Sequence, residues 1–141
     1  MCAVEFRKIT EGGERVPNPP GPQRLTLPPT VVASHLESCA GELATSLTAS
    51  GTAATVPELL QVVEHLIAGQ HALAVALEGL AVRVGGAGDG ALAAAPEVDV
   101  GVVTEVLRAA ATAVGCSAEA LAESLPSFEC VSESVAPDTR L

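Results

Sequence analysis

The sequence predicts an all-α protein, a small helical bundle built around an antiparallel helical hairpin. The chain of 141 residues suits one domain, and its residues are 48% hydrophobic but only 1% aromatic. Its core must therefore consist of Leu, Val and Ala, which favour close helix–helix packing over a sheet sandwich. Leu59, Leu66, Leu73 and Leu80 recur every seven residues, which is the spacing of helices that pack side by side.

The first helix of the hairpin is predicted over residues 30–50. Val32, Leu36, Cys39 or Ala40, Leu43 and Leu47 recur at spacings of three and four residues and form one apolar stripe. The small residues at 51–54 provide a turn of a length common between antiparallel helices.

The second helix is predicted over residues 55–84. Thr55 and Glu58 have the spacing of a capping box, in which each side chain bonds to the other residue's backbone amide. The paired glycines at 85–86 end the helix. At a rise of about 1.5 Å per residue, the helix is on the order of 40 Å long.

The apolar face of this second helix is wider than that of a two-stranded zipper. The positions three residues after the leucines hold Val62, Gly69, Ala76 and Arg83, whereas a zipper needs bulky apolar residues there. A bundle is favoured over a free-standing parallel zipper, and no basic region precedes the leucines as in a DNA-binding zipper. The predicted core or interaction face consists of Leu59, Val63, Leu66, Leu73, Leu77, Leu80 and Val84.

A third helix is predicted over residues 99–114 and a short fourth helix over 117–125. Asp99 is a suitable N-cap for the third helix, and Gly115 ends it. Pro126 stops the fourth helix.

The chain divides into three predicted regions. Residues 1–29 form an extended arm rich in Pro and Gly, and residues 30–125 form the bundle. Residues 126–141 are polar and acidic, and we expect this tail to be disordered.

The charge distribution disfavours nucleic-acid binding. Residues 1–24 contain four basic and three acidic residues, whereas residues 25–141 contain three arginines and fourteen acidic residues. Phosphates would be repelled by such a body. The Ala, Val, Gly and Arg usage is typical of a GC-rich, bacterial genome.

The sequence predicts a cytoplasmic protein with no membrane span. Residues 1–10 contain no apolar run typical of a signal peptide, and residues 66–84 are interrupted by polar groups. The four cysteines are scattered without a disulfide framework, so reduced thiols are expected. Non-classical secretion remains the alternative localisation.

Metal binding is the first chemical function that the residues suggest. His35 and Cys39 are four residues apart on one helix, and Glu64 and His71 share a stripe on the next. That stripe lies away from the predicted core, so these side chains are not expected to converge on one ion. We predict neither a metal site nor a cofactor.

Three further motifs were considered. Cys116 follows Gly115, and a helix beginning there would favour its thiolate. The glycine-rich residues 85–90 follow a helix and lack the Lys and Ser/Thr of a phosphate-binding loop. The last three residues, 139–141, match a carboxylate pattern accepted by strand-adding domains. We expect a buried thiol, a linker and a chance match, and no catalytic residue.

The predicted hairpin at 30–84 resembles the small helical-hairpin proteins of type VII secretion in its architecture. That family carries a Trp-x-Gly turn and a Tyr-x-x-x-Asp/Glu tail. The turn at Ser50-Gly51-Thr52 keeps the glycine, and the chain contains neither Trp nor Tyr. The resemblance implies export and pairing with a sister protein.

These observations together favour a non-enzymatic module for protein–protein interaction or assembly. The second helix carries more apolar surface than the first can cover, so we expect a second copy or a helical partner protein. The alternatives are a type VII secretion-like protein, a subunit of a larger assembly such as a phage particle, and a small metal-binding or thiol protein.

Overall fold

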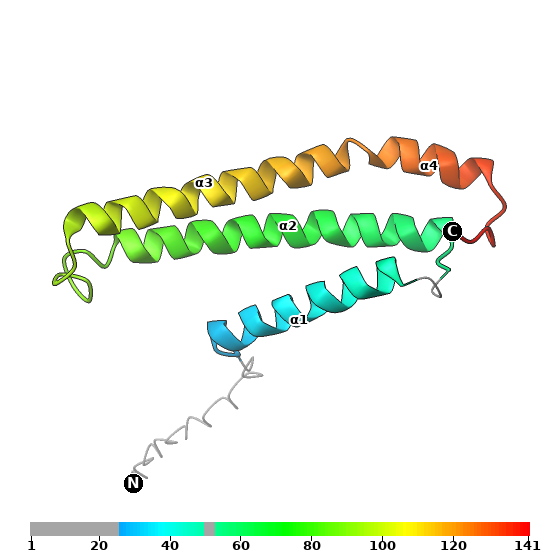
Figure 1. Ribbon diagram of the computed structural model, residues 1–141. Coiled ribbons are helices and arrows are strands. Elements are labelled where there is room, and N and C mark those ends of the chain that lie inside the picture. The colour runs from blue at the N-terminus through cyan, green and yellow to red at the C-terminus, as the bar shows by residue number, and fades with distance from the viewer. Residues whose placement is uncertain (1–25, 50–52) are drawn as a thin grey trace, which may run out of the picture. The chain divides into compact units, whose positions relative to one another are not determined.

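A computed structural model describes residues 26–49 and 53–141, which form a small all-α bundle. The four helices are α1 (Pro29–Thr48), α2 (Val56–Gly85), α3 (Glu97–Ala122) and α4 (Leu125–Ser134) (Figure 1). The chain separates into two compact units, Met1–Thr48 and Ala49–Leu141, which are described one at a time. Most of the predicted arm at 1–29 and the turn at 50–52 lie outside the described residues.

The first unit contains α1, which matches the predicted first helix to within two residues. Its apolar stripe is exposed at Val32, Leu36 and Leu47, and none of the helix residues is buried. The hydroxyl groups of Thr45 and Thr48 donate to the carbonyls of Gly41 and Ala44, four residues back in each case.

In the second unit, α2 begins with the predicted capping box. The Thr55 backbone amide donates to Glu58 Oε2 at 2.7 Å, and the Glu58 amide donates to Thr55 Oγ1 at 3.4 Å. Pro57 lies in the first turn, where its missing amide proton leaves no helical bond unmade. The predicted bounds of this helix, 55–84, differ from the observed ones by one residue at each end.

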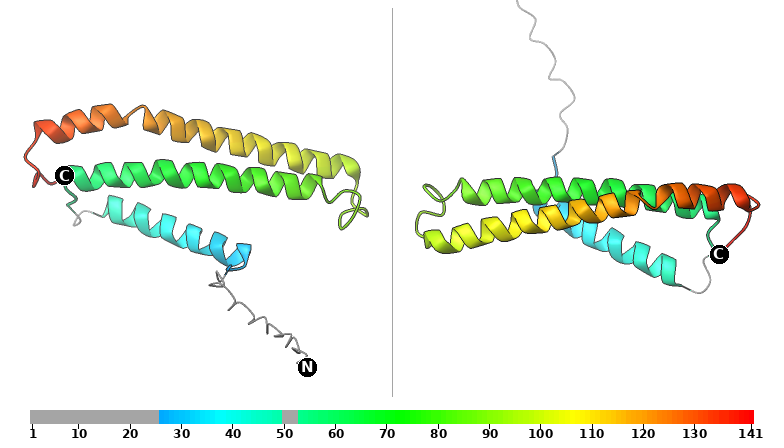
Figure 2. Two further views of the ribbon diagram at one scale, coloured as in Figure 1. Left: turned by 180° about the vertical axis from the view of Figure 1, so that it is seen from behind. Right: turned by 90° about the horizontal axis from the view of Figure 1, so that it is seen from above.

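The antiparallel hairpin of the second unit is formed by α2 and α3, which lie side by side along most of their length (Figures 1 and 2). The helix at 30–50, predicted as the partner of α2, lies in the other unit. Residues 97–122 carry a longer continuous apolar pattern than residues 30–50, and they follow α2 after a short compact turn.

Residues of α2 and α3 that face each other recur alternately every three and four residues, as in a coiled coil. The ion pair between Arg108 and Glu78, and the proximity of Gly85 to Thr104, fix how the two helices align. We call these facing positions the seam. On α2 the seam contains Val56, Leu60, Val63, Ile67, Gln70, Ala74, Leu77, Ala81 and Val84; on α3 it contains Val100, Thr104, Leu107, Ala111, Val114, Ala118 and Leu121.

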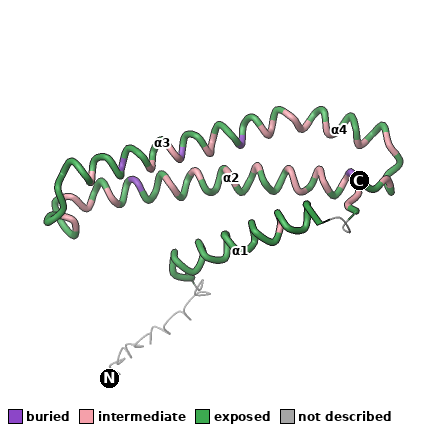
Figure 3. The backbone as a smooth tube through the Cα atoms, in the orientation of Figure 1, coloured by how far each residue is buried: buried purple, intermediate pink, exposed green. Residues whose placement is uncertain are grey.

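The central layers of the seam pair a small side chain with a large one. The alignment places Ala81 opposite Leu107 and Ala111 opposite Leu77. The most buried residues of the hairpin are accordingly small: Ala81 and Ala118 are each 0% exposed. Figure 3 shows the buried positions on the facing sides of the two helices. Small residues in these central layers let the two helices approach closely, since the axes of packed helices lie about 8–10 Å apart depending on the side chains at the contact.

The third helix is longer than predicted at both ends. It begins at Glu97 and continues through Gly115 to Ala122, absorbing most of the helix predicted at 117–125. A glycine within a helix costs only about 1 kcal/mol relative to alanine. Continuing the helix past Gly115 buries Ala118 of the seam, which is 0% exposed.

The C-terminal residues are ordered, whereas we predicted a disordered tail over 126–141. Pro126 occupies the first turn of α4 and therefore starts a helix that we expected it to stop. Beyond α4 the chain returns to the start of α2, where the Val56 amide donates to the Thr139 carbonyl at 3.3 Å. The Leu141 amide donates to the Ala54 carbonyl at 3.0 Å, which closes the end of the hairpin.

The capping box makes the stability of α2 dependent on pH. The Thr55 backbone amide, and then its hydroxyl, donate to the Glu58 carboxylate and lower its pKa below the ordinary value of 4.5. A pKa lowered by folding stabilises the native state above the unfolded-state value, and this stabilisation is lost as the pH falls through the folded-state value. We predict that wild-type protein loses stability more steeply than Glu58→Gln below about pH 4.5 in thermal unfolding.

The same cap is tested independently of charge by Thr55→Ala. We predict a loss of about 1 kcal/mol in the free energy of unfolding, because the N-cap hydroxyl is removed. Thr112→Ala is the matched control, since that hydroxyl only bonds back to the Arg108 carbonyl within α3. Equal effects of the two substitutions in chemical denaturation would contradict the capping role.

We expect a larger side chain to be tolerated outside the seam but not within it. Ala111→Leu places a second large side chain opposite Leu77, so we expect a loss of about 1–3 kcal/mol in the free energy of unfolding. Ala109→Leu adds the same atoms at an exposed position of the same helix and should change stability by less than about 0.5 kcal/mol. Similar denaturant midpoints for both variants would show that the seam is misassigned.

Candidate functional site

The structure divides the predicted interaction face into two sets of residues. Val63, Leu77 and Val84 belong to the seam and are partly buried against α3 and α4. The heptad leucines lie one position before a seam residue and flank the seam on one side. They are Leu59, Leu66, Leu73 and Leu80. The central position of the seam is taken by the residue that follows each of them, so these leucines lie at the edge of the contact between α2 and α3.

The flanking leucines remain partly open to solvent. Leu66 is 37% exposed, Leu73 is 36% exposed and Leu80 is 49% exposed. The alignment of the hairpin places Ala110 and Ser117 of α3 beside them, and these residues are too small to cover a leucine. We define the leucine face as this surface of the hairpin: Leu59, Val62, Leu66, Gly69, Leu73, Ala76 and Leu80 of α2 with Ala110 and Ser117 of α3.

No residue of the leucine face is ionisable. The face spans 21 residues of α2 between its first and last leucine, which is about 32 Å at the rise of an α-helix. Apolar surface of this length is uncommon on a monomeric protein unless it binds something. The leucine face is therefore the strongest candidate for a functional site among the described residues.

The opposite flank of the seam is polar. Glu64, His71 and Glu78 recur there every seven residues on α2. The guanidinium group of Arg108 on α3 reaches Glu78 at 3.7 Å and Glu105 at 2.9 Å. The side chains of Arg108 and Glu78 are about half exposed and that of Glu105 is 74% exposed, so each pair contributes little stability, but the pairs distinguish the two sides of the hairpin.

Gln70 is one of two polar side chains in the seam, the other being Thr104. The Oε1 atom of Gln70 is buried without a hydrogen-bond partner, and the alignment places it opposite Ala118. An unpaired buried acceptor costs about 1–3 kcal/mol. A polar residue in a helical seam disfavours shifted alignments, because a shift would bury it against larger apolar groups.

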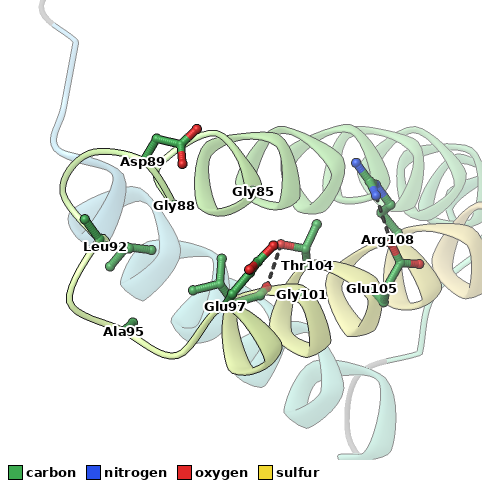
Figure 4. A pocket seen from close by; sticks show the side chains of 12 residues that line it. Gly85, Gly88, Asp89, Leu92, Ala95, Glu97, Gly101, Thr104, Glu105 and Arg108 are labelled. Atoms are coloured by element: carbon green, nitrogen blue, oxygen red, sulfur yellow. Dashed lines mark hydrogen bonds and ion pairs between the residues drawn. The ribbon is translucent and has the colours of Figure 1, made fainter.

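A pocket of about 730 Å³ lies at the turn between α2 and α3. Figure 4 shows Asp89, Glu97, Glu105 and Arg108 around it, all at exposed positions. Thr104 is the buried polar side chain of its lining, and its hydroxyl donates to the Val100 carbonyl at 2.8 Å. The lining residues include no Cys, His or Lys.

The residues considered for metal binding do not come together. Within residues 26–49 and 53–141, no group of three or more His, Cys, Asp and Glu side chains could hold a metal ion. Glu64 and His71 lie on the polar flank of α2, as expected for a solvated face. His35 and Cys39 are both exposed on α1.

Cys116 lies in the interior of α3, where its thiol is free and exposed. We expected a buried thiol, with a helix N-terminus as the alternative that would favour its thiolate. Both are wrong, because α3 continues through Gly115 and Cys116 occupies its outer side.

The glycine-rich turn after α2 is compact. The amides of Gly90 and Leu92 both donate to the Ala87 carbonyl, at 3.1 and 2.9 Å, so they turn inward on the loop itself. None of the described glycines has a positive φ. The C-terminal pattern at 139–141 is held by backbone bonds to the start of α2.

Two segments of the described chain, Val56–Gly85 and Glu97–Ser134, are long and apolar enough to cross a membrane by length and composition. No family model matches the sequence, and comparisons with curated proteins and with solved structures return no match.

Proposed function

We propose that this protein is a non-enzymatic helical module that binds another protein through the leucine face. The observation that carries the proposal is the row of half-exposed leucines at 66, 73 and 80 on an otherwise acidic protein. Fully burying a leucine stabilises a protein by about 1.5–3 kcal/mol. Completing the burial of each half-buried leucine is therefore worth about 1 kcal/mol to a complex.

A protein partner is favoured over a lipid bilayer. The polar flank carries Glu64, His71 and Glu78 on α2 and Arg108 on α3, at depths that a spanning hairpin would place inside the membrane. Binding through one side of the hairpin leaves all of these groups in water. The type VII secretion and structural-assembly hypotheses agree with this proposal and differ in the partner that they require.

Site-specific photo-crosslinking tests the proposal. A small diazirine amino acid replaces Leu73 in one variant and Val75 in the control, in cells that naturally produce the protein. Val75 is 73% exposed and Leu73 only 36%, so random collisions would label Val75 more. We predict discrete protein adducts at position 73 and few at position 75.

Two outcomes would contradict the proposal. Equal or stronger labelling at position 75 would show that the leucine face is not a preferred contact. Adducts at position 73 that consist of lipid, together with flotation of the purified protein on vesicles of neutral phospholipid, would assign the face to a membrane.

A further inference from the structure

We infer that the leucine face is covered by a second copy of the same chain, with the two α2 helices packed antiparallel across a two-fold axis near residue 71. This inference rests on the proposed function and names its partner. The occupant is argued from the order of large and small residues along the face and from the charges at its two ends.

Along α2, large side chains of the leucine face lie opposite small ones when a second copy of the helix runs in the opposite direction. The central members of the face at 66, 69, 73 and 76 alternate between large and small residues, whereas the outer members Val62 and Leu80 are both large. When one copy is reversed about residue 71, Leu66 lies opposite the partner's Ala76. By the same operation, Leu73 lies opposite the partner's Gly69. Each central leucine therefore meets a small residue, as in the seam of the hairpin.

The space for such contacts exists at Gly69. A Cβ atom placed on this glycine would have no heavy atom within 4 Å, so the surface above it is open. The partner's Leu73 has the size to fill that space. A parallel arrangement in the same register would instead place leucine opposite leucine and leave facing gaps at Gly69, which close packing disfavours.

Charge also favours the antiparallel arrangement. Arg83 follows the face at one end of α2 and Glu58 precedes it at the other, while the stretch between them is uncharged along the face. Among the described residues, Arg83 forms no salt bridge. The two-fold axis brings Arg83 of each copy to the Glu58 end of the other. A parallel pair would place like charges together at both ends.

The contact area is sufficient for a stable dimer. A strip about 32 Å long and about 20 Å wide, the width of two helices, covers about 640 Å² on each copy. Two copies would bury about 1,300 Å² in total, above the value of about 1,000 Å² that a specific interface requires. The polar flanks of both hairpins remain in water, so the acidic groups at 64 and 78 are not forced together.

Disulfide trapping in the full-length chain tests the arrangement. In a background with all four native cysteines replaced by serine, the double variant Leu66→Cys/Ala76→Cys is oxidised under mild conditions. The two sites are about 15 Å apart along one helix, too far to bond within a copy. We predict that most of the protein becomes a covalent dimer on a non-reducing gel.

Matched variants distinguish the arrangement from random collision. Leu66→Cys alone should remain monomeric, because the two-fold axis separates position 66 from its own copy by about 15 Å. Ala72→Cys/Val82→Cys has the same spacing away from the leucine face and should also remain monomeric. Efficient crosslinking of Leu66→Cys alone would show a parallel pair and would overturn the inference.

The disulfide-trapping experiment tests the second-copy inference, and the photo-crosslinking experiment tests the proposed function, so either proposal can be contradicted without the other. A monomeric double variant combined with adducts from position 73 to a different protein would overturn the second-copy inference and leave the proposed function standing. A monomeric double variant combined with adducts to residues 26–48 of the same chain would overturn both, because the face would then be internal.

Discussion

The close packing of α2 against α3 through paired small and large side chains is the constraint on which the rest of this structure depends. Alanines at 81 and 118 are fully buried because the helices meet there, and they allow the larger residues opposite to fit. The narrow seam also leaves large apolar side chains beside it partly exposed. When two helices approach along a narrow line of alanines, bulky residues beside that line stay partly outside, and the heptad leucines are such residues.

Much of the fold could be predicted from the sequence, because the signals for α2 are local. The capping box of Thr55 and Glu58 and the glycines at 85–86 define that helix without reference to any partner. These local signals do not determine which helix packs against α2. The choice of partner depends on which other segment continues the apolar pattern, and the pattern over residues 100–121 consists largely of Ala, Val and Thr, whose periodicity is less conspicuous than that of leucine.

The heptad leucines were predicted as part of a core or interaction face, and the structure places them beside the seam. Two heptad patterns lie one residue apart on α2: the leucines from Leu59 to Leu80, and the residues at 60, 67, 74 and 81. Both have helical periodicity, so periodicity alone does not identify the core. Side-chain size points to the leucines, whereas burial follows the second pattern because Ala74 and Ala81 permit the closest approach. The expectation of surplus apolar surface follows from either assignment.

The central claim is that this surplus surface joins two copies of the chain, and light scattering on the purified protein tests it most directly. Over micromolar concentrations we predict a mass twice that of the 14.1 kDa monomer. Leu73→Glu should restore the monomer, because it places a charge at the centre of the face, whereas Val75→Glu should remain a dimer. A wild-type mass equal to one chain throughout that range, or equal masses for the two variants, would contradict the account.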